Sequence, residues 1–272
     1  MRRATAWLAC AGVVCSAQLA NGESLTIVSY NVESGGASAA TVAAEIEKLP
    51  GVDVWGFSEL ASEAWLATFE LAAEHASGAP FGTILGTTGK STSVGRDADL
   101  LGVLYREDLL ERLGQSELQS INDWGHRAPL VAEFRLHRTA TRFLLVLNHL
   151  ASKDAGLRLQ QSHQLREWAL FREAPLVMIG DFNYRWRIGK SERNHPPGFD
   201  ALTRDRVLQW VRPAKLRATW CGGKQDSVLD FAFVNAAARR WNPNADVIDT
   251  ACTKSSQLVS DHRPVRVSFD LP

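Results

Sequence analysis

The sequence predicts an α/β protein of the α+β kind, with helices outside antiparallel or mixed β-sheets. Segments with strand patterns and segments with helix patterns both recur along the 272 residues, and several neighbouring strand segments have no helix between them. Such an order favours antiparallel or mixed sheets over a regular strand–helix–strand winding. Because 45% of the residues are hydrophobic, the chain can bury the core of one large domain or two small ones.

The expected strands are apolar, β-branched-rich runs that end at polar or turn residues. In chain order they are residues 25–32, 52–60, 100–105, 130–136, 142–150, 176–182, 228–235 and 264–271. Three further segments have helical composition and apolar spacing: residues 39–49, 63–76 and 156–171. Pro50 and Gly51 stop the first of these helices. We see no internal repeat or low-complexity linker, so nothing in the pattern divides the chain.

The longest irregular stretch is residues 183–200, "NYRWRIGKSERNHPPGFD". It directly follows a strand that ends in polar residues. A long loop in such a place is usually functional or mobile.

The N-terminus predicts a secretory signal peptide over residues 1–20. Arg2 and Arg3 form a basic region, and residues 4–20 are small and apolar without a charge. This segment is too short and too rich in alanine for a membrane span. The alternative is a disordered or initial-helix N-terminus. We therefore expect an exported protein, periplasmic or released, with no stable membrane anchor.

Two cysteines, Cys221 and Cys252, follow this segment. Export to an oxidising compartment would join them in one disulfide. The alternative is two separate buried thiols, because sequence spacing does not show proximity.

The chain carries 30 basic and 30 acidic residues. It therefore has no global field, positive or negative, that would grip a polyanion or a basic partner. Binding of nucleic acid would have to depend on a local patch.

Polar side chains stand at the ends of several expected strands. Five apolar runs end on, or begin just after, such residues, and a sixth carries an acid at its start: Asn31; Glu59; Asn148 and His149; Asp181 and Asn183; Asp261 and His262; Asp230. A buried acid costs several kcal/mol unless it is paired or binds a metal, so repetition at so many strand ends argues against a purely structural origin. If these ends lie at one edge of a sheet, the side chains converge.

Metal-assisted phosphodiester hydrolysis suits this set of residues. Carboxylate and amide oxygens without a cysteine partner favour Mg²⁺, Mn²⁺ or Ca²⁺ over zinc. A divalent ion neutralises charge that grows on a phosphoryl oxygen, and a histidine beside an aspartate can act as acid or base. Nucleophilic serine motifs such as G-x-S-x-G are absent, which favours direct attack by water.

The motifs "SYNVES", "GFSEL", "HRAPLVAEF", "LNHLAS", "IGDFNYRW", "VLDFAFV" and "SDHRPV" span Ser29 to Val265. In this order they resemble the endonuclease/exonuclease/phosphatase superfamily, which includes DNase I, exonuclease III-type nucleases and neutral sphingomyelinases. The resemblance implies a four-layer sandwich, in which two mixed sheets pack face to face between outer helices. It also implies a single domain over residues 21–272.

The resemblance assigns roles position by position. Glu59 matches the principal metal carboxylate, Asn31 lies beside it, and Asp261 matches an acid near the metal. Asp181 matches the residue that orients or deprotonates the attacking water, and Asn183 its neighbour. Residues i and i+2 of an extended chain point the same way, which would put Asp181 and Asn183 on one face.

The histidines and the arginine have counterparts too. His262 matches the catalytic histidine, Asp230 the acid that orients it, and His149 a second histidine at the scissile phosphate. Arg127 aligns with a phosphate-contacting arginine, and Asp99 with an acid that orients His149.

Several of these residues also have structural alternatives. Asp261 could cap a turn before Pro264, Asn31 could bond backbone, and His149 could be a core histidine. Arg127 could be an exposed charge and Asp99 a solvated turn acid.

Two departures from DNase I-like members bear on the substrate. Those members carry an arginine two positions after the metal glutamate and a tyrosine two positions before the acid that orients the histidine. This chain has Ala61 and Asp97 there. Both changes argue against a DNase I-style grip on duplex DNA.

The irregular stretch offers basic residues interleaved with aromatic ones: Arg185, Arg187, Lys190 and Arg193 with Tyr184 and Trp186. Such a pattern suits phosphate contacts, above all by Arg185 and Arg187, and base stacking. The alternative is an ordinary solvated loop. Trp220 could pack in the core or line the same mouth.

We therefore expect an exported, monomeric phosphodiesterase that needs Mg²⁺ or Mn²⁺, with Ca²⁺ as a structural or supporting ion. Nucleic acid is the expected substrate: an endonuclease on DNA, with RNA as a further substrate. No protein partner is implied. The alternatives are a phospholipid phosphodiesterase of the sphingomyelinase type, another phosphoesterase of the superfamily, and a catalytically silent binding module.

Overall fold

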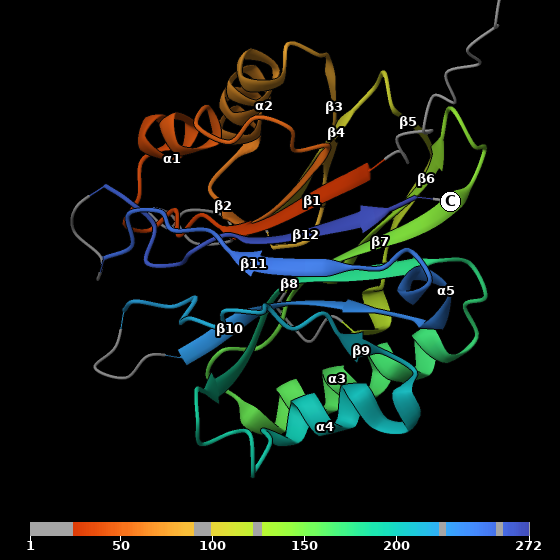
Figure 1. Cartoon of the computed structure of the whole chain (residues 1–272). Coiled ribbons are helices and arrows are strands. Elements are labelled where there is room, and N and C mark those ends of the chain that lie inside the picture. Colours follow the sequence, from red (N-terminus) through yellow and green to blue (C-terminus); the bar gives the residue numbers. More distant parts are fainter. Residues whose placement is uncertain (1–23, 90–98, 122–126, 223–226, 254–257, 272) are drawn as a thin grey trace, which may run out of the picture.

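Two six-stranded β-sheets form the centre of the protein, and helices cover both outer faces (Figure 1). The computed structural model describes residues 24–89, 99–121, 127–222, 227–253 and 258–271. The expected signal peptide therefore lies outside the described residues, as does Asp97. The four-layer sandwich expected from the resemblance is confirmed.

The first sheet has the order β11-β12-β1-β2-β4-β3. Its strands are β1 (Ser24–Asn31), β2 (Val54–Leu60), β3 (Phe81–Leu85), β4 (Leu100–Arg106), β11 (Asn244–Val247) and β12 (Val265–Asp270). Only the pair β1–β2 is parallel among the paired strands of this sheet. Helices α1 (Ala39–Ile46) and α2 (Glu63–Ser77) lie on its outer face (Figure 1).

The second sheet has the order β5-β6-β7-β8-β10-β9. Its strands are β5 (Leu110–Glu117), β6 (Leu130–Leu136), β7 (Arg142–His149), β8 (Leu176–Arg187), β9 (Gln209–Trp210) and β10 (Ser227–Val234). Here β7 and β8 form the parallel pair. The outer helices are α3 (Ala155–Leu170) and α4 (Pro197–Thr203), while the short α5 (Ala236–Arg239) follows β10.

Local sequence explains where the longer helices begin and end. The side chains of Ser38 and Asp154 accept hydrogen bonds from the amides of Thr41 and Leu157, which caps α1 and α3. Gly78 ends α2 in the left-handed conformation (φ 69°), which favours glycine. Two 3₁₀ turns, Gln119–Ile121 and Arg204–Arg206, complete the helical elements among the described residues.

Three apolar layers hold the sandwich together. Leu145 and Ile179 of the second sheet and Val267 of the first belong to the layer between the sheets. Phe57 and Phe69 pack in the layer beneath α1 and α2, and a third layer lies under α3 and α4. Because residues of β1, β2, β4, β7, β8 and β10 alternate between two of these layers, these strands are apolar on both faces.

Strand β8 is longer than the sequence pattern predicts. It continues past Phe182 to Arg187, because Ser227 and Val228 of β10 pair with Arg187 and Trp186. The expected irregular stretch therefore begins with strand. No described helix is long and apolar enough to cross a membrane.

Candidate active site

Three neighbouring strands of the second sheet place His149, Asp181 and Asp230 in one row. His149 of β7 is the register partner of Asp181 on β8, and Asp230 of β10 is its partner on the other side. All three are at most 4% exposed. The sheet register alone therefore brings together two acids and a histidine that are distant in sequence.

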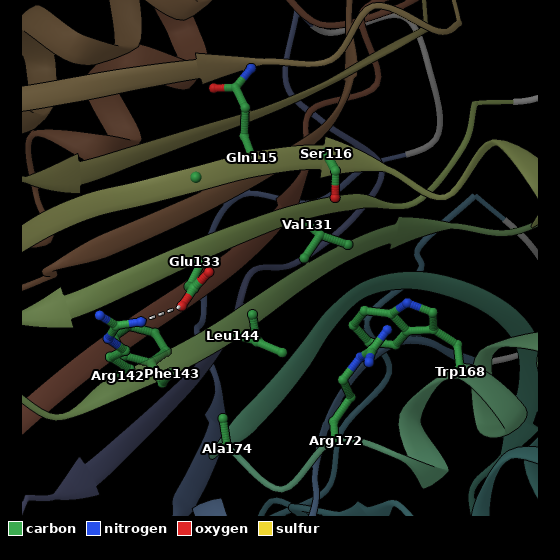
Figure 2. A pocket seen from close by; sticks show the side chains of 11 residues that line it. Gln115, Ser116, Val131, Glu133, Arg142, Phe143, Leu144, Trp168, Arg172 and Ala174 are labelled. Atoms are coloured by element: carbon green, nitrogen blue, oxygen red, sulfur yellow. Dashed lines mark ion pairs between the residues drawn. The ribbon is translucent and has the colours of Figure 1, made fainter.

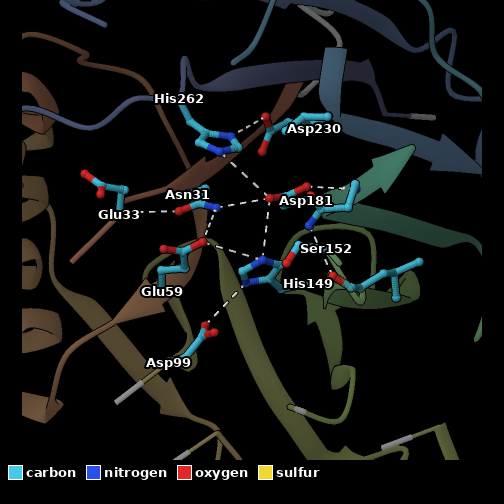
Figure 3. A network of polar contacts seen from close by, with 12 residues as sticks. Asn31, Glu33, Glu59, Asp99, His149, Ser152, Asp181, Asp230 and His262 are labelled. Carbon is cyan, nitrogen blue, oxygen red and sulfur yellow. Dashed lines mark hydrogen bonds and ion pairs between the residues drawn. The ribbon is translucent and has the colours of Figure 1, made fainter. Parts of the chain in front are cut away.

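His262 reaches this row from the segment before β12 (Figure 3). Its Nδ1 lies 2.8 Å from Asp230 Oδ2, and its Nε2 lies 3.9 Å from Asp181 Oδ2. His149 Nε2 approaches the same Asp181 oxygen at 3.5 Å. Asp181 thus lies between two histidines.

The first sheet contributes Asn31 and Glu59. The Asn31 amide donates hydrogen bonds to Glu59 Oε1 at 2.9 Å and to Asp181 Oδ2 at 3.1 Å, which ties the two sheets together. Its Oδ1 accepts from the Glu33 amide at 3.0 Å. Glu59 has φ 60° at a register irregularity of β2, a conformation that costs energy and clusters at functional sites.

Asp181 and Asn183 line one pocket, but simple strand alternation does not explain why. Asn183 has φ 53°, so the backbone is not extended there. Its amide N–H donates to Asp181 Oδ1 at 2.8 Å, and its side chain donates to the Leu150 carbonyl at 3.1 Å. A tight turn within β8, held by the aspartate itself, places both side chains.

Gly180, just before this turn, lets β8 lie close to β7. Its φ is 130°, and a Cβ built there would lie 1.9 Å from the carbonyl oxygen of Asn148. Only glycine lets β8 approach β7 so closely. Asn148 itself donates to the carbonyls of Val146 and Ile179, so its side chain serves the sheet rather than the pocket.

Asp99 and Arg127 flank His149 on the side away from His262. Asp99 Oδ1 lies 3.3 Å from His149 Nδ1, and Arg127 donates to the other oxygen of Asp99. Arg127 is only 8% exposed. Asp99 is therefore not a solvated turn acid, and Arg127 is not an exposed charge. His149 lies at the pocket rather than in the apolar core.

Asp261 is held by the short segment that contains Trp220. The indole of Trp220 donates to Asp261 Oδ2 at 2.8 Å, and Trp220 pairs with His262 as an isolated bridge. Trp220 lines the pocket and is not fully buried, which decides between its two predicted placements. The predicted disulfide between Cys221 and Cys252 is present next to it.

The basic run after Asn183 contributes one side chain to the pocket among the described lining residues, Arg185. Arg187, Lys190 and Arg193 are exposed outside it. The expectation that Tyr184 and Trp186 stack on bases is wrong. Both are buried, at 3% and 2% exposure, because β8 continues and turns them under α4, where they pack against Phe199.

Burial and neighbouring charges shift the pKa values of Asp181 and His262. Burial and the charge of Asp230 raise the pKa of Asp181 to about 6, although both histidines act against this. Burial alone would lower the pKa of His262, but the charge and hydrogen bond of Asp230, with Asp181, raise it to about 10. At neutral pH this pairs an aspartate poised to accept a proton with a cationic histidine.

Glu33 is a site residue that the strand-end pattern did not single out. It lines the pocket, and burial together with the charges of Asp261 and Glu59 raises its pKa to about 7. The only signal is its position two residues after Asn31 in "NVE". Because Glu33 lies in a turn with φ 45°, strand alternation could not place it.

The donor set fits a hard divalent cation. Ligand atoms of Glu59, His149 and Asp181 lie within 4.8 Å of one another, as do those of Asp181, Asp230 and His262. Asn31 and Asp261, the other expected ligands, lie beside these groups. Carboxylate oxygens dominate and no free thiolate is present among the described residues, which suits Mg²⁺ or Mn²⁺.

A pocket of about 330 Å³ is lined by Glu59, His149, Asp181, Asp261 and His262, among other residues. A larger hollow of about 440 Å³ lies elsewhere, on the outer face of the second sheet beside α3 (Figure 2). Its charged lining includes the ion pair Glu133–Arg142 and Arg172, which stacks on Trp168. It contains no histidine and no pair of acids, so the chemistry belongs to the smaller pocket.

Solved structures with the same fold place the chain among known proteins. An endonuclease/exonuclease/phosphatase family protein from Bacteroides thetaiotaomicron aligns with a TM-score of 0.67 at 17% identity, covering 92% of this chain and 99% of the other. A mannosyl-6-phosphatase from the same species gives 0.63 at 18%, covering 89% and 98%. TDP2 of D. rerio, in complex with a single-strand DNA product, gives 0.65 at 16%, covering 90% and 98%. At these identities the likeness shows the fold.

No curated protein matches the chain. The sequence model of the Endonuclease/Exonuclease/phosphatase family, in contrast, matches residues 28–262, which contain every residue of the pocket described above. The fold, the polar strand ends and this match agree: the chain belongs to the endonuclease/exonuclease/phosphatase family of phosphoesterases.

Proposed function

We propose that this protein is an exported, divalent-metal-dependent phosphodiesterase that hydrolyses nucleic acid. The observation that carries the proposal is the buried Asp181 carboxylate between His262 and His149, facing a pocket that also contains Arg127 and Arg185. An aspartate poised to orient water, beside cationic groups that stabilise developing charge, is the arrangement that phosphoryl transfer to water requires.

In this mechanism Asp181 orients and activates the attacking water, and Asn183 steadies it. The raised pKa of Asp181, about 6, makes the carboxylate a better proton acceptor than an exposed aspartate. The turn that bonds the Asn183 amide to Asp181 Oδ1 leaves Oδ2 directed toward the histidines. Water is the nucleophile, so no covalent enzyme intermediate forms.

His262 remains cationic at neutral pH because Asp230 accepts its Nδ1 proton. Its Nε2–H is then available to a phosphoryl oxygen or to the leaving oxygen. His149 contacts the phosphate from the opposite side, oriented by Asp99, while Arg127 and Arg185 bind the phosphate charge.

Glu59, with Asn31 and Asp261, would hold the divalent cation. Mg²⁺ or Mn²⁺ held there would supply positive charge against the charge that grows on a non-bridging phosphoryl oxygen. The Asn31 amide, which donates to both Glu59 and Asp181, keeps the two carboxylates from separating.

Two features support export. Residues 1–20 have the pattern of a secretory signal, and Cys221 and Cys252 form a disulfide, a bond that persists mainly in oxidising compartments. We further propose that the protein acts as a monomer.

Nicking of supercoiled plasmid tests the proposal. We expect nicking in Mg²⁺, none with excess chelator, and none for His262→Ala. His75→Ala is the matched control, because His75 is an exposed histidine on α2 that does not line the pocket. Nicking that survives chelator or His262→Ala would contradict the proposal.

Folded protein that leaves plasmid intact but hydrolyses single-stranded oligonucleotides would restrict the substrate to single strands. It would also agree with Ala61, which stands where DNase I-like members carry the arginine that grips duplex DNA. Hydrolysis of a phospholipid head group with no action on nucleic acid would replace the proposal by the phospholipid phosphodiesterase alternative.

A further inference from the structure

We propose that the Cys221–Cys252 disulfide is a positioning device for the active site, so that its reduction by a dithiol switches the enzyme to a low-activity state. The expected effect on turnover rests on the proposed function, whereas the positioning of Asp261 and His262 by the disulfide does not depend on it. In the reaction, the S–S bond of the protein breaks and two thiols form, while the dithiol gives up two electrons and two protons and closes to its own disulfide.

Both halves of the disulfide meet the backbone of one site residue. The amide of Cys221 donates to the Asp261 carbonyl at 2.8 Å, and Cys252 Sγ lies 3.2 Å from the same oxygen. A disulfide sulfur carries no proton, so the second contact is one of packing. The Asp261 carbonyl is therefore enclosed by the cross-link.

The side chain of Asp261 is held by the same segment. Trp220, the residue before Cys221, donates from its indole to Asp261 Oδ2 at 2.8 Å. Gly222, the residue after it, packs so closely that a Cβ there would lie 2.6 Å from Asp261 Oδ2. Three consecutive residues around one half of the disulfide thus define where Asp261 lies.

A two-stranded ribbon transmits this placement to His262. The Cys221 amide bonds the Asp261 carbonyl, the Arg263 amide bonds the Thr219 carbonyl at 2.7 Å, and Trp220 and His262 are bridge partners between them. Ser227 of β10 also holds this ribbon, because its carbonyl accepts at 3.1 Å from the amides of Thr219 and Trp220. Cys252 anchors the ribbon from a further stretch of chain, 31 residues after Cys221.

Reduction removes that anchor, because the two thiols move from bonding distance to van der Waals contact and their segments are no longer linked covalently. His262 keeps its bond to Asp230, but its backbone, with Asp261 and the indole of Trp220, gains freedom. Misplacement of a catalytic group by about 1 Å can cost about 10²-fold in rate, so we expect kcat to fall by that order while KM changes little.

The test compares oxidised and dithiol-reduced protein, in Mg²⁺, well below the melting temperature. We expect the fall in kcat to reverse on reoxidation. The double variant Cys221→Ala/Cys252→Ala should have the low kcat with or without dithiol. Asn235→Ala, which removes four hydrogen bonds at the far end of β8, is the stability control and should lower the melting temperature without lowering kcat.

Amide hydrogen exchange provides a readout that needs no turnover. Reduction should accelerate exchange at Cys221 and Arg263, and leave the amide of Asn235, bonded to Leu176, unchanged. Equal exchange in both redox states, or a kcat that dithiol does not alter, would overturn the inference. Faster exchange at Cys221 and Arg263 in a protein that hydrolyses no phosphodiester would support the positioning role and count against the proposed function alone.

Discussion

The two site histidines have similar burial but different partners. His262 and His149 are each 4% exposed, and each has an aspartate near its Nδ1. Asp230 is itself buried and lies 2.8 Å from His262. Asp99 has a side chain 35% exposed, lies 3.3 Å from His149, and also accepts from Arg127.

The difference shows how surroundings assign roles to identical side chains. Water screens the charge of the buried Asp230 carboxylate very little, whereas it screens that of the partly exposed Asp99 more, and Asp99 also pairs with an arginine. The pKa of His262 is accordingly raised to about 10, which makes this histidine a permanent cation at neutral pH. This difference supports the proposed division of roles, in which His262 stabilises charge or donates a proton and His149 contacts the phosphate.

The largest effect should come from removing the cationic histidine. His262→Ala should lower kcat about 10³- to 10⁴-fold, since it removes both an acid and a charge aimed at the phosphoryl group. Steady-state rates on a nuclease substrate, beside the melting temperature, measure this. A folded variant with kcat within tenfold of wild type would contradict the role of His262 as the cationic group of the site.

His149→Ala should cost less, about 10²-fold in kcat, because one phosphate contact is lost while Arg127 and Arg185 remain. The ratio of the two losses measures the asymmetry between the histidines. A loss equal to that of His262→Ala would mean that both act in the same step.

Substitutions of the two aspartates, Asp230 beside His262 and Asp99 beside His149, should also lower kcat unequally, with smaller losses. Asp230→Asn should lower kcat about 10²-fold, because the buried charge that keeps His262 protonated is gone, and Asp99→Asn only about tenfold, because that charge is already shared. The pH–rate profile separates the two: its alkaline limb should move to lower pH for Asp230→Asn and stay in place for Asp99→Asn.

The smallest effect concerns stability without metal. A group whose pKa is higher in the folded state stabilises the fold fully below its unfolded pKa, and this contribution is lost as pH rises through the folded value. For His262 the window runs from 6.5 to about 10. The melting temperature in chelator should therefore fall by about a few degrees between pH 7 and 10.

Asp181 and Glu33 also have raised pKa values, about 6 and about 7. Their contributions to the stability of the fold are therefore largely lost by pH 7, so they add little to the decline between pH 7 and 10. In His262→Gln the decline between pH 7 and 10 should flatten, whatever the absolute stability of the variant. An unchanged slope would show that His262 is not held as a cation in the folded protein.

The sequence by itself determined the central strands and the polar ends that carry the chemistry. Strands β1, β2, β4, β7, β8 and β10 are apolar on both faces, whereas β6 and β12 alternate apolar with polar residues. All eight runs are visible in the sequence. The four strands that the pattern missed, β3, β5, β9 and β11, are the edges of the two sheets. An edge strand is covered on fewer sides, so its apolar pattern is short or broken, as in "LERLGQSE" of β5.

Only the tertiary structure decided how the polar ends meet. The row of His149, Asp181 and Asp230 depends on register between strands, and the bond from Asn31 to Asp181 on the packing of one sheet against the other. Glu33, Trp220 and the grip of the disulfide on Asp261 depend on turns with no period that a pattern could detect. Sequence periodicity records which face of an element is buried, whereas the distance between two elements is decided by everything packed between them.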